Sequence, residues 1–231
     1  MGVVCRTASC RIPRCASVRY DKAFAKKLGV NLEYIERFID REDTAKKLAE
    51  IPHTCTEEEL LIHCVAASKI INIYRQTAQP VVSFWDMCTQ LMESSLYEGK
   101  EHVYKCLTFR KEEIVLPSGM SLRYPNLRPE KNKETKSWEW VYGEEGVKPT
   151  KLYGGKITNN IVQGTARIVM TDGMLRVNKH YPVKGTVHDE LIAVVPDEEV
   201  DHAKTWVLAQ MTMEPKYLPG IPLAADGGAH R

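Results

Sequence analysis

Two adjacent carboxylates late in the chain are the first residues whose types and spacing could do chemistry. They lie in the run TVHDELIAVV, where Asp189 and Glu190 follow His188 between two apolar segments. This pattern predicts a β-hairpin with the acids at its tip, and a hairpin gives side chains a rigid support. Carboxylate oxygens held in this way suit a hard cation such as Mg²⁺. An acidic hairpin tip that only contacts solvent is the alternative, and the tripeptide leaves both interpretations open.

A helix is predicted before this hairpin, and it carries a polar stripe. Asn160, Gln163 and Arg167 follow one another at spacings of three and four residues, which places them along one helix face. Gly164 costs a helix about 1 kcal/mol relative to alanine, so we expect it to let a ligand approach closely. Amide and guanidinium donors suit the acceptors that base pairs present in a duplex minor groove. A solvated helix face is the alternative.

The elements that must position these residues predict an α+β fold. Apolar periodicity and capping signals predict helices over residues 20–51, 56–79, 81–97, 156–180 and 198–213. Alternation predicts strands over residues 102–110 and 113–124, the second bent at Pro117-Ser118-Gly119. It also predicts the hairpin over residues 183–195, with 126–150 an extended loop or short hairpin. In the last third, this order indicates helices packed on one face of an antiparallel sheet.

Three regions follow from this pattern. Residues 1–19 mix Cys, Arg and Pro without periodicity, so we expect an irregular, disordered segment. Residues 20–100 are expected to be helical. Residues 101–231 are expected to form the α+β region that carries the hairpin.

Composition limits the function classes. The chain has 231 residues, 43% of them hydrophobic and 27% charged, which excludes collagen-like and wholly disordered proteins. The net charge of +2 gives no global basic field, so a nucleic-acid surface must be local. Seven cysteines without a secretory signal predict free thiols in a reducing compartment. Since no apolar run approaches the ~18 residues that span a bilayer, we expect a cytoplasmic protein without a membrane partner.

Several segments together resemble one protein family. The strongest are KLYGGKITNNIVQGTAR (151–167), VHDELIAVVP (187–196) and LPGIPLAADGG (218–228). They resemble the carboxy-terminal palm segment of family A DNA polymerases, most nearly the bacteriophage branch. TVHDE is similar to the last catalytic motif of that family, and the YGGK helix resembles the one that contacts primer-template DNA. LPSGMSLRYPN (116–126) and QPVVSFW (79–85) look like segments between the fingers and the palm.

The resemblance implies an activity and a role for each residue singled out above. It implies a DNA-directed DNA polymerase that uses two Mg²⁺ ions about 4 Å apart, with primer-template DNA and deoxynucleoside triphosphates as partners. Asp189 would ligate metal, Glu190 would be its acidic neighbour near the metals, and His188 would contact the primer end. Asn160, Gln163 and Arg167 would hold the duplex. Residues 20–100 would derive from the fingers, and a phage-encoded chain would act in the bacterial cytoplasm.

The sequence also departs from the family pattern. The first catalytic motif, an Asp that ends an apolar strand, is missing upstream, and Pro13 stands where the triphosphate-binding helix with its Arg, Lys and Tyr should lie. Ile168 replaces an Asp that many relatives carry. We therefore expect an incomplete palm: a C-terminal fragment, inactive alone, that needs a companion polypeptide with the upstream motifs. A non-catalytic DNA-binding module or a truncated remnant is the alternative. A metal-dependent nuclease or phosphatase fits less well, because such sites gather three or more carboxylates.

Two other groups of residues are weaker candidates. Four metal-ligating side chains stand close in the sequence but match no standard zinc spacing: His53, Cys55, His63 and Cys64. Trp138 and Trp140 could stack on bases. In an alternating strand they would instead pack on one face, and the sequence leaves both possibilities open.

Overall fold

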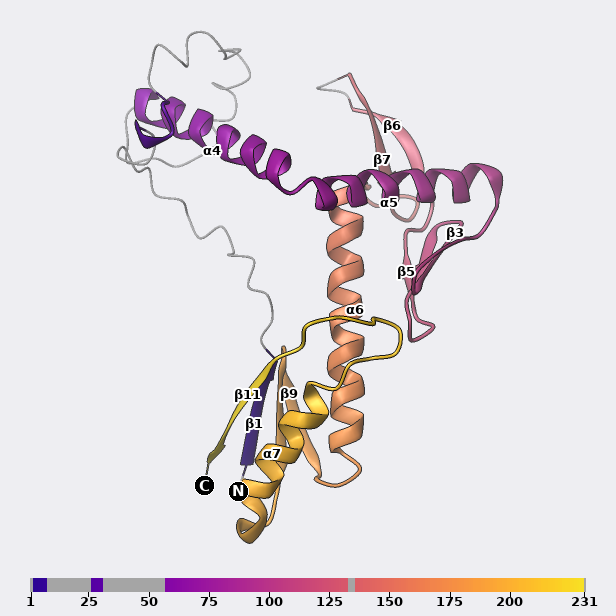
Figure 1. The fold of residues 1–231 in the computed structure, drawn as a ribbon. Coiled ribbons are helices and arrows are strands. Elements are labelled where there is room, and N and C mark those ends of the chain that lie inside the picture. The colour runs from indigo at the N-terminus through magenta and orange to yellow at the C-terminus, as the bar shows by residue number, and fades with distance from the viewer. Residues whose placement is uncertain (1, 8–25, 31–56, 133–135, 231) are drawn as a thin grey trace. The chain divides into compact units, whose positions relative to one another are not determined.

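Figure 1 shows the computed structural model, which describes residues 2–7, 26–30, 57–132 and 136–230. The chain forms two compact units. One unit is Arg11–Ser83, and the other joins Met1–Cys10 to Phe84–Arg231. The second unit contains the predicted hairpin and the predicted polar helix, so its architecture decides what these residues can do.

The described helices correspond to four of the helices that the sequence predicts. They are α4 (Glu57–Thr77), α5 (Gln79–Glu98), α6 (Gly154–Val177) and α7 (Val200–Met211). α4 ends just before Pro80, and α5 takes Pro80 into its first turn, where the missing backbone N–H has no helical partner to lose. In the part of the chain that the structure describes, no helix is both long and apolar enough to cross a membrane.

A four-stranded antiparallel sheet carries the hairpin. Its strand order is β11-β1-β10-β9, and the strands are β1 (Gly2–Thr7), β9 (Val183–Val187), β10 (Glu190–Val194) and β11 (Ala225–His230). β10 therefore pairs with β9 on one side and with β1 on the other. The hairpin that the sequence predicts is part of a larger sheet, which fixes its direction.

The second sheet differs from the predicted strands. Each of the two runs expected as one strand is a hairpin, and the sheet order is β2 (His102–Tyr104), β3 (Leu107–Arg110), β4 (Glu113–Val115) and β5 (Ser121–Arg123). The first run turns at Lys105, which takes the left-handed φ of 53°. Neither Lys105 nor Cys106 is a usual turn residue, so the sequence carries no signal for this turn.

The polar stretch 126–150, expected as an extended loop or short hairpin, contributes to a third sheet. β6 (Arg128–Lys131), β7 (Trp138–Tyr142) and β8 (Thr150–Leu152) form a three-stranded antiparallel sheet. Trp140 packs against the apolar core, whereas Trp138 is exposed. Packing is thus confirmed for Trp140, and base stacking by Trp138 stays a prediction.

The long helix α6 contributes to two hydrophobic cores. Its first part packs Ile157, Ile161 and Ile168 with α5 and the second sheet, including the fully buried Phe109 and Ile114. Its last part packs with β10 and α7 in a second core, whose members are Met170, Val177, Tyr181, Leu191, Ala193, Val195, Ala203, Val207 and Met211. One rigid element therefore joins the hairpin to the rest of the unit.

The double glycine at the start of α6 has a packing cause. A Cβ added to Gly154 would lie 2.2 Å from the carbonyl oxygen of Trp85 and 2.9 Å from its Cα atom. α5 thus crosses the first turn of α6 at a distance that only glycine permits. Gly155 meets a softer neighbour, because its added Cβ would lie 3.2 Å from the ring of Tyr153.

The α+β class is confirmed, since helices and antiparallel sheets both build the unit that carries the hairpin. Residues 2–7 form β1, which differs from the irregular segment expected over 1–19; a six-residue strand is too short to reveal its periodicity. Residues 8–19 of that segment lie outside the described residues. The two compact units divide inside α5, after Ser83.

Candidate functional site

The tip of the hairpin is a tight two-residue turn. Glu190 pairs with Val187, so His188 and Asp189 alone connect β9 to β10. His188 has a φ of 54°, a conformation that residues other than glycine rarely adopt. Strained residues of this kind cluster at functional sites, where the surrounding structure holds them in place.

The support beneath this turn is apolar and buried. Leu191 and Ala193 of β10, and Val195 directly after it, alternate along the chain and pack against α7 and the end of α6 in the second core. Because these side chains fix the register of β10, they also fix where the turn lies. Asp189 and Glu190 are half-buried and His188 is exposed. The acids thus stand at the rim of a packed core, with access to solvent.

One further carboxylate, that of Asp226, belongs to the row of paired residues that crosses the sheet from Glu190. Glu190 pairs with Arg6 of β1, and Arg6 pairs in turn with Asp226 of β11. At normal strand spacing, Asp226 lies about 10 Å from Glu190 along this row. That separation is too large for both carboxylates to bind one ion.

The polar stripe of α6 differs by one residue from the predicted one. Gln163 and Arg167 are exposed, as a ligand-binding face requires. Asn160 is half-buried, and its Nδ2 atom donates a hydrogen bond of 3.1 Å to the hydroxyl of Tyr124. Burial raises the pKa of Tyr124. Asn160 therefore holds a buried tyrosine of its own chain.

Asn159 takes the exposed place that the sequence interpretation gave to Asn160. It is exposed, and it precedes Gln163 by four residues, as Gln163 precedes Arg167. We call Asn159, Gln163 and Arg167 the α6 polar stripe. Asn159, Gln163 and Arg167 follow one another at four residues, and this regular spacing could have identified Asn159. Asn160 precedes Gln163 by three residues, which also suits one helix face.

Arg167 connects this stripe to the hairpin. Its Nη1 atom donates a hydrogen bond of 3.4 Å to the backbone carbonyl of His188. The bond spans 21 residues of sequence and joins the end of the stripe to the turn that carries the acids. One predicted duplex-binding residue therefore contacts the turn next to the predicted metal-binding residues.

The space beside Gly164 is filled by side chains of this chain. A Cβ added there would lie 2.7 Å from Cδ1 of Leu116 and 3.7 Å from Cδ2 of Leu122. The glycine thus accommodates the hairpin of β4 and β5 against α6. The prediction that Gly164 lets a duplex approach is wrong, because its side of the helix is covered by apolar side chains.

The donors for a metal ion are incomplete in the described residues. These residues contain no group of three or more His, Cys, Asp or Glu side chains that could hold an ion. Asp189 and Glu190 still fit Mg²⁺ in part, since this ion is often bound by one or two carboxylates and takes its other ligands from water and substrate phosphates. His53 and Cys55 lie outside the described residues, as do the side chains of His63 and Cys64.

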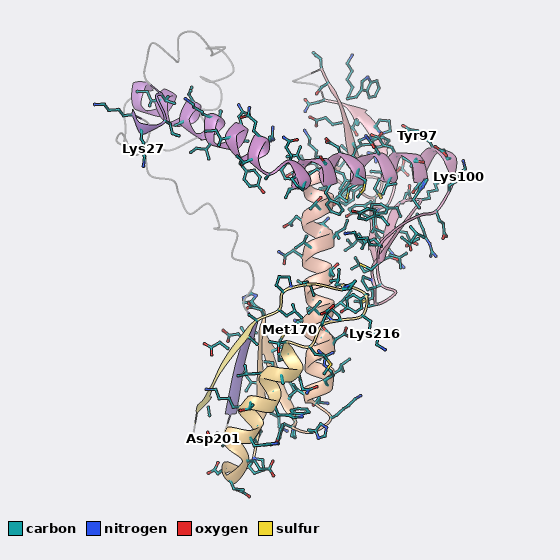
Figure 2. All side chains as sticks on the ribbon, in the orientation of Figure 1. Lys27, Tyr97, Lys100, Met170, Asp201 and Lys216 are labelled. Carbon is teal, nitrogen blue, oxygen red and sulfur yellow. The ribbon has the colours of Figure 1, made fainter. Side chains whose placement is uncertain are left out.

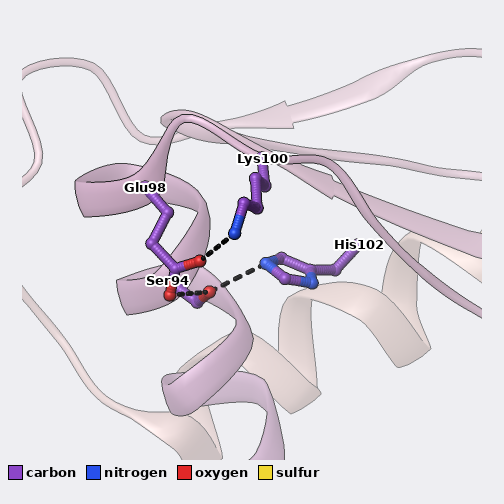
Figure 3. Close-up of polar contacts among 4 residues, drawn as sticks. All are labelled: Ser94, Glu98, Lys100 and His102. Carbon is purple, nitrogen blue, oxygen red and sulfur yellow. Dashed lines mark hydrogen bonds and ion pairs between the residues drawn. The ribbon is translucent and has the colours of Figure 1, made fainter.

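A second polar cluster lies at the end of α5, and Figure 3 shows its contacts. Ser94 Oγ donates to Glu98 at 3.0 Å and lies 2.8 Å from Nε2 of His102, while Lys100 forms an ion pair with Glu98 at 3.0 Å. Hydrogen bonds from Lys100 and Ser94 lower the pKa of Glu98. Ser94 has one proton and gives it to Glu98, so His102 must donate to Ser94. The cluster ties α5 to β2 and does not activate the serine as a nucleophile.

No family model matches the chain. The chain is similar to a DNA polymerase of Bacillus phage SP02, with 30% identity over 169 residues. The aligned region covers 69% of this chain and 26% of the phage protein. The chain thus spans much less than two thirds of the length of that relative.

Proposed function

We propose that this chain is the carboxy-terminal palm portion of a family A, bacteriophage-type DNA polymerase. It would supply part of the site for nucleotidyl transfer to a primer 3′-hydroxyl. The hydrogen bond between Arg167 and the His188 carbonyl carries the proposal, because it joins a donor-rich helix face to a carboxylate-bearing turn. The similarity to a phage protein named DNA polymerase points the same way.

In this proposal, different residues of the chain bind the duplex, contact the primer end and hold the metal ions. The exposed amides of Asn159 and Gln163 would donate to minor-groove acceptors of the primer-template duplex, independently of its sequence. Arg167 would hold the turn by its bond to His188, and His188 would contact the primer end. Asp189 and Glu190 would hold Mg²⁺ beside the primer 3′-oxygen. When bound, paired Mg²⁺ ions lower the pKa of that hydroxyl and stabilise the pyrophosphate that leaves as the new phosphodiester bond forms.

The proposal includes a companion polypeptide. The described residues lack a third carboxylate close to Asp189 and Glu190. Two-metal sites need ligands for both ions. In this proposal, a companion polypeptide supplies the further carboxylates and the cations that bind the triphosphate. Alone, this chain would bind primer-template DNA without extending it.

Primer extension with and without the companion tests this function. The companion is a polypeptide that carries the upstream catalytic and triphosphate-binding motifs of the family, and the assay measures nucleotide incorporation into a labelled primer in the presence of Mg²⁺. We expect extension from the mixture and none from either chain alone. Absence of extension from the mixture, together with unaltered binding of primer-template DNA, would favour the second candidate function.

That second candidate is a non-catalytic DNA-binding module. The incomplete carboxylate set in the described residues favours it. Affinity for duplex DNA measured across a salt series distinguishes a genuine DNA surface, because phosphate contacts give a steep loss of affinity with salt. Substitution of Gln163 by Ala should weaken duplex binding under both candidate functions, whereas only the polymerase requires Asp189.

A further inference from the structure

Two exposed aromatic side chains have no role in the proposed transfer reaction. Trp138 of β7 is 70% exposed, and Tyr97 near the end of α5 is 68% exposed. Figure 2 labels Tyr97 close to Lys100, at the end of that helix. Large aromatic rings normally bury most of their surface, so two rings left open in one part of a unit suggest a binding surface.

A third aromatic ring, that of Trp140, contacts Tyr97 and lies on the same strand as Trp138. Trp140 Nε1 donates a hydrogen bond of 2.5 Å to Glu93 of α5, and its ring lies 5.8 Å from that of Tyr97 at an interplanar angle of 58°. Trp138 precedes Trp140 by two residues on β7, so both side chains lie on the same face of the strand. We call Tyr97, Trp138 and Trp140 the aromatic platform. The ring of Trp140 is anchored by Glu93, and the rings of Tyr97 and Trp138 are exposed.

The strand register places a cation on this face. Trp138 pairs with Lys131 of β6, and Trp140 pairs with Pro129 on one side and Leu152 on the other. Lys131 is exposed. By this register, the described strand residues that share the face of the platform include no Asp or Glu.

The opposite face of the same sheet is neutralised. There Arg128 forms an ion pair with Glu130 at 3.4 Å, and Lys151 forms one with Glu139 at 2.5 Å. Both pairs follow from the two-residue alternation of strands, which puts their members on the side away from Trp138. Charge is thus balanced on one face of the sheet and positive on the other.

The acids that α5 brings to the platform are also engaged. Glu93 accepts the bond from Trp140, and Glu98 is held by Ser94 and Lys100. Both carboxylates therefore already accept hydrogen bonds from groups of this chain. The surface over Trp138 therefore combines flat aromatic area with a lysine.

We propose that the aromatic platform binds single-stranded nucleic acid, with bases stacked on Trp138 and Tyr97 and a phosphate near Lys131. Stacking on aromatic side chains beside a cation is how proteins bind single strands without reading sequence. The identification of that strand as template DNA rests on the proposed polymerase function. The binding itself rests only on the platform.

The test is fluorescence anisotropy with two labelled probes, oligothymidine and a hairpin duplex, added to the full chain. Trp138→Ala should weaken oligothymidine binding about 5- to 100-fold, the effect expected for one lost stacking contact. Tyr74→Ala is the matched control, because Tyr74 is an aromatic side chain of α4 that is 50% exposed. Lys131→Gln should reduce the salt dependence of oligothymidine binding. Circular dichroism checks that each variant keeps its fold.

Each outcome decides the proposal. Loss of oligothymidine affinity in Trp138→Ala, with duplex affinity kept, supports it. Equal oligothymidine affinity in Trp138→Ala and the parent chain overturns it. So does a parent chain that does not bind oligothymidine, which would assign the platform to a protein partner. Gln163→Ala separates this test from the proposed function, because it should weaken only duplex binding.

Discussion

Substitution of Gly154 by alanine tests the helix crossing that positions α6. The added Cβ would lie 2.2 Å from the carbonyl oxygen, 2.6 Å from the carbonyl carbon and 2.9 Å from the Cα atom of Trp85. These are backbone atoms, so no side-chain rotation can relieve the overlap. Either α5 or the first turn of α6 must move by about 1 Å to restore a normal contact distance.

The cost of this movement can be bounded. Overpacking a well-packed contact costs about 1–3 kcal/mol and sometimes more. Alanine returns at most about 1 kcal/mol of helix propensity, and less in the first turn. We therefore expect Gly154→Ala to lower the free energy of unfolding by about 2 kcal/mol.

The neighbouring glycine provides a matched control. Gly155→Ala has the same change in composition and the same helix. Its Cβ would meet the movable ring of Tyr153 at 3.2 Å and the ring of Trp85 at 3.7 Å, an ordinary contact distance, and no backbone atom. We expect it to leave stability unchanged or to raise it by up to about 1 kcal/mol. Urea unfolding followed by circular dichroism and by tryptophan fluorescence measures both variants. Equal stabilities for the two variants would refute the close crossing of α5 and α6.

Two further predictions concern polar side chains. Asn160→Ala should lower the free energy of unfolding by about 1–2 kcal/mol, because it leaves the buried Tyr124 hydroxyl without the amide donor. Asn159→Ala should leave the free energy of unfolding unchanged and weaken duplex binding. The reverse pattern would contradict the inclusion of Asn159 in the α6 polar stripe. Tyr217 donates to Asp172 at 2.7 Å, and burial and this carboxylate raise the pKa of Tyr217. The hydrogen bond from Tyr217 should stabilise the fold fully below the pKa of about 10 that tyrosine has in the unfolded chain. This stabilisation should decline as the pH rises above that value. Tyr217→Phe should therefore cost about 1 kcal/mol at pH 7 and less in alkaline urea titrations, and a cost that does not change with pH would contradict this linkage.

The sequence predicted the elements whose signals are local. α4 ends before Pro80, which lies in the first turn of α5, and the apolar runs around His188-Asp189-Glu190 form the hairpin of β9 and β10. Periodicity over α6 is long enough to define a helix of 24 residues. These features depend on neighbours in sequence, so the sequence alone is sufficient for them.

Features that depend on tertiary contacts were not predictable in the same way. The turn at Lys105 has no Gly, Asn or Pro, and β1 is stabilised by pairing with β10 and β11, far away in sequence. Asn159 precedes Gln163 by four residues and Asn160 precedes it by three, and both spacings suit one helix face. The hydrogen bond from Asn160 to Tyr124 distinguishes them. Gly164 suggested an approaching ligand, whereas Leu116 fills that space. In each case the deciding partner lies on another element.

The most direct test of the central proposal is the rate of nucleotide incorporation by Asp189→Asn in the complemented primer-extension assay. Glu198→Gln is the control, because Glu198 is an exposed acid outside the hairpin. The account predicts that Asp189→Asn lowers the rate by about 100-fold or more, with primer-template affinity and the rate of Glu198→Gln close to those of the parent chain. Incorporation by Asp189→Asn at the rate of the parent chain would contradict the assignment of the hairpin as the metal-binding part of a polymerase site.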